Sequence, residues 1–138
     1  MARKHLAVFV KGMAEKILSG VKSVEVRLSL HEVLPYKKVS KDDIIFLKIS
    51  GGKIIGRVSV DNVLYYENLD KETVLNIQKE YNQEVSMDES FWQSKYSAKF
   101  ATIIFLKKPT KFLASLVFRK TDRRPWVIIE EEGHRVDE

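Results

Sequence analysis

The chain has 138 residues, of which 44% are hydrophobic and 31% are charged, a composition typical of one folded domain. No apolar run approaches the roughly 20 residues that span a bilayer, so we expect no membrane contact, and no signal peptide is recognisable at the N-terminus. The lack of cysteine excludes disulfides, thiolate zinc sites and cysteine nucleophiles, and a cytoplasmic protein is the simplest prediction.

Charge is unevenly distributed along the chain. The net charge is +5, but residues 130–138 hold five acidic residues and one arginine, which leaves +9 over residues 1–129. A basic body suits a polyanion such as nucleic acid, although it also suits a protein that merely stays in solution. We therefore expect one domain over residues 1–129 and a disordered acidic tail over 130–138, which we hypothesise shields the basic surface.

Hydrophobic periodicity predicts the elements of the first half in chain order. Alternation indicates strands, and a short amphipathic run indicates a helix between the first two of them. The expected elements are a strand over 5–11, a helix over 13–19, a strand over 23–29, and strands over 44–50 and 54–60. Gly51 to Lys53 form a hairpin loop in this interpretation, and Gly56 within a strand predicts a bulge or sharp curvature.

The second half begins with helices. Asp70 is the expected N-cap of one helix, and the capping-box pattern from Ser86 to Glu89 predicts a second helix that ends at Tyr96. Three further strands are expected over 101–107, 112–119 and 126–129. About six short strands with two to three flanking helices predict an α+β fold, a small mixed β-barrel that is closed or nearly closed.

The most informative segment, residues 20–27, lies at the junction between a helix and a strand. Gly20 suits the left-handed residue that follows a helix. From Ser23 onward alternation places Glu25 and Arg27 on one strand face and valines on the other. Lys22 has the parity of the valines, so it joins Glu25 and Arg27 only if the chain bends after Gly20. The alternative is an exposed acid–base pair that contributes about 0–1 kcal/mol to stability.

This segment resembles the signature of a known family. Gly20, Lys22, Glu25 and Arg27 match the G-x-K-x-x-E-x-R motif of ASCH domains, which are small β-barrels related to the PUA RNA-binding fold. The resemblance covers roughly residues 5–129, though outside the motif it is a match of element order only. It implies a PUA-like barrel with a cleft beside the motif strand, an RNA or nucleoside-sized ligand, and no cofactor.

One branch of ASCH-like proteins deacetylates acetylcytidine with the motif lysine, a threonine on the signature strand and a glutamate from a later helix. Lys22 matches the lysine, Glu25 stands at the threonine position, and Glu80 is a loose match for the later acid. A neighbouring carboxylate keeps a lysine protonated, so this departure counts against deacetylation. Other ASCH-like proteins are ribonucleases, and Lys22, Glu25, Arg27 and Lys48 supply suitable acid–base and phosphate-stabilising groups.

A second basic constellation lies over residues 119–126. Arg123, Arg124 and Trp126 form a surface suited to phosphate contact and base stacking, unless Trp126 is buried in the core. Residues 107–111 are expected to form a solvated basic turn. In each of the pairs Tyr65–Tyr66 and Phe91–Trp92, one ring is expected to pack inward while the other lines a groove. The three histidines show no metal-ligand spacing, so no metal is expected.

The leading hypothesis is an RNA-binding module that holds a phosphate or a nucleobase in a basic cleft. The alternative is a small hydrolase acting on RNA or on an acylated nucleoside, with Lys22 and Glu25 as its catalytic pair. A protein-interaction domain is a third class, expected if the aromatic pairs form an exposed patch, and protein partners are otherwise undefined. The expected ligand-binding residues are Gly20, Lys22, Glu25, Arg27, Lys48, Arg123, Arg124 and Trp126.

Overall fold

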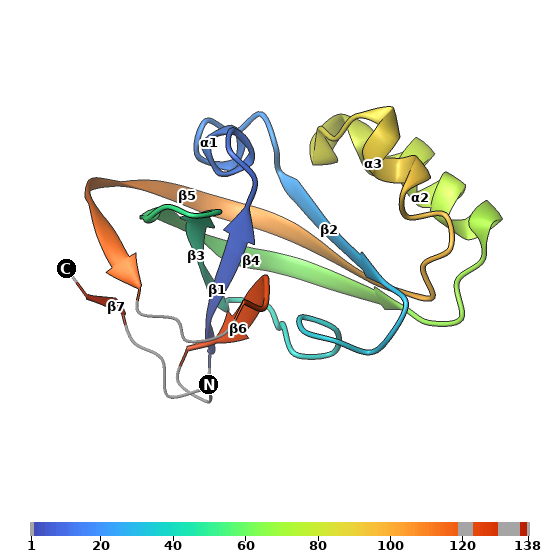
Figure 1. Ribbon diagram of the computed structural model, residues 1–138, viewed down its shortest axis with the longest axis horizontal. Coiled ribbons are helices and arrows are strands. Elements are labelled where there is room, and N and C mark those ends of the chain that lie inside the picture. Colours follow the sequence, from blue (N-terminus) through green and yellow to red (C-terminus); the bar gives the residue numbers. More distant parts are fainter. Residues whose placement is uncertain (1, 119–122, 130–135, 138) are drawn as a thin grey trace.

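The computed structural model describes residues 2–118, 123–129 and 136–137. Its elements in chain order are β1 (Lys4–Phe9), α1 (Met13–Leu18), β2 (Val24–Ser29), β3 (Ile44–Ile49), β4 (Ile54–Tyr66), α2 (Lys71–Val85), α3 (Glu89–Gln93), β5 (Phe100–Phe118), β6 (Trp126–Ile128) and β7 (Val136–Asp137). Figure 1 shows the arrangement of these elements. None of the described helices is long and apolar enough to cross a membrane.

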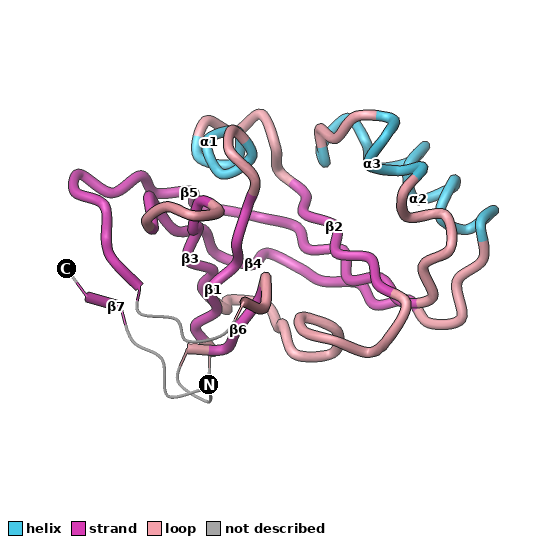
Figure 2. Tube along the Cα trace, in the orientation of Figure 1, coloured by secondary structure: helices cyan, strands magenta, loops and turns pink. Residues whose placement is uncertain are grey.

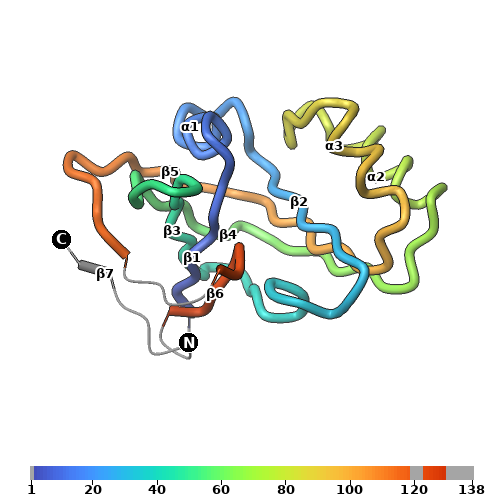
Figure 3. Tube along the Cα trace, in the orientation of Figure 1, coloured from blue at the N-terminus to red at the C-terminus, as the bar shows by residue number. Residues whose placement is uncertain are grey.

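The strands form one strongly curled mixed sheet in the order β2-β5-β4-β3-β1-β6, and β7 pairs with the far end of β5. The β1–β3 pair is parallel and the other pairs are antiparallel. Figure 3 shows that β1 and β6, which come from opposite ends of the chain, lie side by side. The sheet is a half-open barrel with α2 and α3 beside β2, as the α+β, barrel-like prediction required.

Two clusters of buried side chains lie on the two faces of β2. Ile104, which pairs with Glu25, belongs to the cluster inside the barrel, together with Phe9 and Trp126. Val24 and Val26 belong to the other cluster, which fills the space between the sheet and the helices α2 and α3. Because both faces of this edge strand are covered, the alternative of a solvated acid–base pair is wrong: Glu25 is only 7% exposed.

The strands of the second half are longer than expected. The stretch over 101–119 was expected to be two strands joined by a basic turn, but β5 is one strand of 19 residues, and β4 extends to Tyr66. Figure 2 shows both strands as long continuous runs. The cations of the expected turn, Lys107, Lys108 and Lys111, lie within β5, where a shift of register and the positive φ of Lys108 replace a reversal of the chain. Pairing with β4 therefore outweighs the turn propensity of Pro109.

The helix caps also differ from the sequence prediction at one point. Asp70 caps α2 as expected, because its side chain accepts a hydrogen bond from the backbone N–H of Thr73. The capping box of the next helix was wrong: Ser86 is the left-handed C-cap of α2, and Asp88 caps α3 instead. Gly56 lies at a register shift between β4 and β5, as its sequence context predicted. Of the acidic tail only Val136 and Asp137 are described, and they pair with β5.

Candidate functional site

A tight turn brings Lys22 to the site. Gly20 adopts a positive φ of 84°, and the backbone N–H of Lys22 donates to the carbonyl oxygen of Lys16, so the chain bends before β2 begins. The side chain of Lys22 is 1% exposed. Its ammonium donates to the carbonyl oxygen of Val85 at 2.6 Å and lies 3.0 Å from Glu25 Oε1. Val85 is the last residue of α2, where a free carbonyl and the helix dipole both favour a cation.

Glu25 links the two cations of the motif. Its Oε1 pairs with Lys22, and its Oε2 accepts a hydrogen bond from Arg27 Nε at 2.9 Å. Burial alone raises the pKa of the Glu25 carboxyl, but the Lys22 ammonium and the Arg27 guanidinium outweigh burial and hold that pKa below its usual value. Glu25 is therefore an ionised hydrogen-bond acceptor between the two cations.

Arg27 reaches across to the opposite side of the barrel. Its Nη2 donates to the carbonyl oxygen of Val8 at 3.1 Å, and its guanidinium lies 5.0 Å from the ring centre of Phe9 and 5.1 Å from that of Trp126. Such cation–π contacts and the two hydrogen bonds fix the plane of the guanidinium. Within the described part of the chain, Nη1 has no hydrogen-bond partner, so one donor group stays available to a ligand.

Trp126 is positioned by a chain of buried contacts with His5 and Asp43. Its indole N–H donates to His5 Nδ1 at 3.1 Å, and His5 Nε2 lies 2.8 Å from a carboxylate oxygen of Asp43. Because Nδ1 accepts from the indole, the proton of a neutral His5 is on Nε2, facing Asp43. His5 is fully buried, and this chain of contacts orients the ring that supports Arg27.

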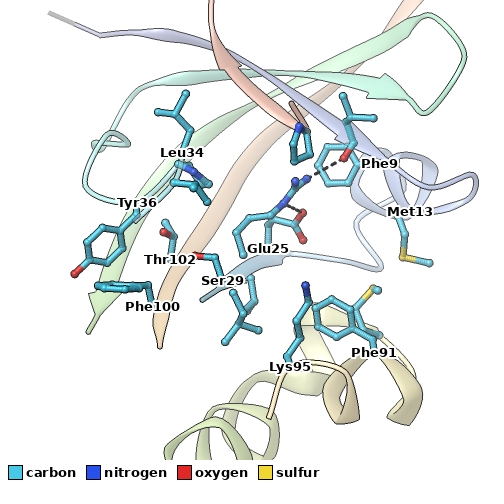
Figure 4. Close-up of a pocket in the computed structure, with 18 of the residues that line it drawn as sticks. Phe9, Met13, Glu25, Ser29, Leu34, Tyr36, Phe91, Lys95, Phe100 and Thr102 are labelled. Atoms are coloured by element: carbon cyan, nitrogen blue, oxygen red, sulfur yellow. Dashed lines mark hydrogen bonds and ion pairs between the residues drawn. The ribbon is translucent and has the colours of Figure 1, made fainter. Parts of the chain in front are cut away.

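These groups line a pocket of about 340 Å³ at the opening of the barrel. Figure 4 shows Glu25 among the lining side chains, with Tyr36 and Phe100 on one side and Phe91 and Lys95 on another. The walls are mostly apolar and aromatic, and the polar groups gather around Glu25. The lining includes Phe9, Lys22, Glu25, Val26, Arg27, Leu28, Tyr36, Phe91, Lys95, Phe100 and Thr102.

The free edge of β2 adds backbone groups to this lining. The carbonyl oxygen of Ser23 accepts a hydrogen bond from the N–H of Leu106 in β5, and that of Ser29 accepts one from Lys99, just before β5. In an antiparallel pair every second residue of a strand bonds to the same neighbouring strand. The N–H and C=O groups of Val26 and Leu28 therefore point away from β5. Val26 and Leu28 both line the pocket. The outer edge of β2, which pairs with no described strand, therefore borders the pocket.

The other predicted ligand residues lie outside the pocket lining. Lys48 is on β3 and donates to the carbonyl oxygen of Ile49 at 3.3 Å. Arg123 and Arg124 are exposed next to Pro125, which does line the pocket. Trp126 is 1% exposed, so its expected role as an open stacking surface is replaced by support of Arg27 from within the core. The rest of the basic constellation, residues 119–122, lies outside the described residues.

Several lining residues were missed by the sequence analysis. Tyr36 comes from an irregular segment, and Lys95 follows α3, so neither belongs to a pattern that the sequence could connect to β2. Thr102 did carry a signal, because it is the polar residue in the apolar run from Ala101 to Ile104. The Phe91–Trp92 pair divides as expected: Trp92 is fully buried and Phe91 lines the pocket.

The comparisons with known proteins rest on structure alone. No family model and no curated protein sequence matches the chain. The crystal structure of ASCH from Zymomonas mobilis superposes with a TM-score of 0.68 at 14% identity, covering 94% of this chain and 90% of that one. The fold is that of an ASCH domain. A serine-to-alanine mutant of the same ASCH protein gives a TM-score of 0.69 at 14% identity over the same shares.

A second protein shows a more distant structural likeness. Protein EF3133 from Enterococcus faecalis superposes with a TM-score of 0.50 at 10% identity, covering 83% of this chain and 85% of that one. Because the ASCH structure matches over nearly the full length of both chains, the likeness includes the half-open barrel and its flanking helices. The strand β2 thus lies within the part of the chain that shares the ASCH fold.

Proposed function

We propose that the protein binds single-stranded RNA by taking one unpaired base into the pocket beside Glu25 and Arg27. The observation that carries the proposal is the combination of aromatic walls with a fixed polar row, Lys22–Glu25–Arg27, in a pocket of about 340 Å³. Pockets of this size accommodate small ligands, and unpaired bases are recognised by stacking and by hydrogen bonds to their edges.

The hydrogen bonds inside the site favour a base over a phosphate as the group that enters the pocket. Lys22 donates to Val85 and pairs with Glu25, and Arg27 uses Nε and Nη2 on Glu25 and Val8. Both cations are thus already engaged inside the protein, by the Glu25 carboxylate and by two backbone carbonyl oxygens. What remains is the acceptor capacity of Glu25 for an exocyclic amine and one donor group of Arg27, a pattern that complements a base edge.

Charge and shape favour a polymer over a free base. The pocket lining contains three cations, Lys22, Lys95 and Arg27, against the single acid Glu25. The chain up to residue 129 carries +9, and Arg123 and Arg124 are exposed next to the pocket residue Pro125. A strand whose base enters the pocket brings its phosphates past these surface cations.

The test is binding of a short, fluorescein-labelled single-stranded RNA of mixed sequence, followed by fluorescence anisotropy. We expect affinity to fall steeply as salt rises, and Arg27→Ala to weaken binding by at least about tenfold. Lys111→Ala, which removes an exposed cation of β5 outside the pocket lining, is the matched control and is expected to have a much smaller effect. Equal effects of the two variants would indicate nonspecific charge, and absence of binding at micromolar protein would refute the proposal.

Hydrolysis of RNA or of an acylated nucleoside is the competing function. A lysine that acts as a nucleophile or base must lose its proton, but Lys22 is paired with an ionised Glu25 and donates to Val85. Incubation with acetylcytidine and with labelled RNA, with Lys22→Met as the control, distinguishes the two functions. Turnover by the wild type that is lost in the variant would replace the binding proposal.

A further inference from the structure

Thr102 places a hydroxyl group in the pocket that the protein itself does not use. The residue is 1% exposed and lines the pocket, and among the described residues its side chain has no hydrogen-bond partner. The described residues hold one fully enclosed side-chain polar atom without a partner, Gln78 Oε1, so the Thr102 hydroxyl is not enclosed and is open to the pocket and to a group that occupies it. The other lining hydroxyl with a described donor role, that of Ser29, donates to the carbonyl oxygen of His31 and is already satisfied.

The sheet fixes the position of this hydroxyl relative to the polar row. Thr102 on β5 pairs directly with Arg27 on β2, so the two side chains lie on the same face of the sheet. Glu25, two residues before Arg27, lies on that face as well. Figure 4 shows Thr102 between Tyr36 and Glu25, that is, between an aromatic wall and the carboxylate. A ring that lies against the aromatic wall therefore presents its edge to Thr102 and Glu25 together.

The three polar groups on this face differ in chemistry. The Glu25 carboxylate only accepts hydrogen bonds, the Arg27 guanidinium only donates them, and a threonine hydroxyl does either. We propose that the Thr102 hydroxyl hydrogen-bonds the edge of the bound base and is a specificity-determining contact of this pocket. This inference rests on the proposed RNA-binding function and adds to it a residue outside the sequence motif.

The proposal predicts that one substitution lowers affinity for RNA without lowering stability. Thr102→Val replaces the hydroxyl by a methyl group of similar size on a residue that suits a strand. Because the hydroxyl has no described partner within the fold, its removal is expected to leave the free protein about as resistant to urea as the wild type. The same change removes a hydrogen bond from the complex, which is expected to weaken binding of the labelled RNA about three- to tenfold. A residue with a structural role alone would lower stability and leave affinity unchanged.

Two further variants complete the experiment. Thr102→Ser keeps the hydroxyl and is expected to retain affinity close to that of the wild type. Thr110→Val makes the same substitution at an exposed position of β5 outside the pocket lining and is expected to leave affinity unchanged. Wild-type binding together with an unchanged affinity of Thr102→Val would overturn the role of Thr102 while the RNA-binding function stands. A wild type that binds no RNA would instead refute the function itself, and a Thr102→Val protein that unfolds at lower urea would show that the hydroxyl is satisfied within the fold.

Discussion

Arg27 Nη2 donates a hydrogen bond to the carbonyl oxygen of Val8 across a distance of 3.1 Å. The two residues lie on β2 and β1, which are not neighbours in the sheet order. Their contact spans the opening of the half-open barrel, and the pocket contains both residues. Arg27 is consequently a structural link between two strands, and in the proposed function it is also the group that donates to the bound base.

Arg27→Lys tests the structural part of this role. Lysine keeps the charge, but its ammonium does not reproduce the planar fork that contacts Glu25 and Val8 together. We expect the free energy of unfolding, measured with urea, to fall by about 1–3 kcal/mol. Arg57→Lys on β4, where the side chain is exposed, is the matched control and should change stability by less than about 0.5 kcal/mol. An equal response of the two positions would show that Arg27 does not link the strands.

The Lys22–Glu25–Arg27 row predicts an order of stabilities. Glu25→Gln removes the shared anion and leaves the buried Lys22 with the Val85 carbonyl alone, so a loss of about 3–5 kcal/mol is expected. Lys22→Met costs less, because Glu25 keeps its hydrogen bond from Arg27. Chemical unfolding of the two variants and of the double variant measures the coupling. Additive losses would contradict the row, since residues that share a charge do not act independently.

The lowered pKa of Glu25 gives stability a pH dependence of known sign. Between the folded value and the usual value of 4.5, the unfolded chain binds more protons than the folded one. The contribution of Glu25 is therefore complete above pH 4.5 and is lost as the pH falls through the folded value. Asp42, Asp70 and Asp88 have lowered pKa values for other reasons, so the difference between wild type and Glu25→Gln isolates this site. A difference that stays constant with pH would contradict the assignment.

Gly56 provides a prediction about the barrel itself. A Cβ atom at this position would lie 2.6 Å from the carbonyl oxygen of Thr110 and 2.7 Å from Leu18 Cδ2. The leucine side chain is able to move, but the carbonyl belongs to the backbone of β5. We expect Gly56→Ala to destabilise the protein by about 1–3 kcal/mol in thermal or urea unfolding. Gly52→Ala, which meets only contacts of 3.2 Å or more in a loop, is the control, and equal losses would refute close packing of β4 on β5.

The sequence predicted those features of the fold that depend on neighbouring residues, and it missed those that depend on contacts between distant strands. The period-two pattern of β2, the left-handed Gly20 and the Asp70 cap are local features, and each was predicted correctly. The continuity of β5 was not, because pairing with β4 carries the strand through Pro109. Local sequence around a proline holds no information about a partner strand.

The same distinction applies to the candidate site. The motif residues Lys22, Glu25 and Arg27 were chosen from the sequence, and the structure brings all three into one row. Their surroundings were not predictable, because Tyr36, Thr102 and Trp126 reach the site only through the order of the strands and the path of a loop. The burial of Trp126 in particular depends on the pairing of β6 with β1. That pairing brings Trp126 into hydrogen-bond contact with His5, 121 positions earlier in the chain.

The pairing of β1 with β6 also has a consequence for the order in which the protein is made. Phe9 is synthesised long before Trp126, yet Arg27 contacts both rings. The barrel strands β2 to β5 can pair before β6 exists, whereas the aromatic support of Arg27 is complete only when β6 has been synthesised and has paired with β1. The order of synthesis therefore leaves the support of Arg27 until last, after all residues of the pairs among β2 to β5 are available.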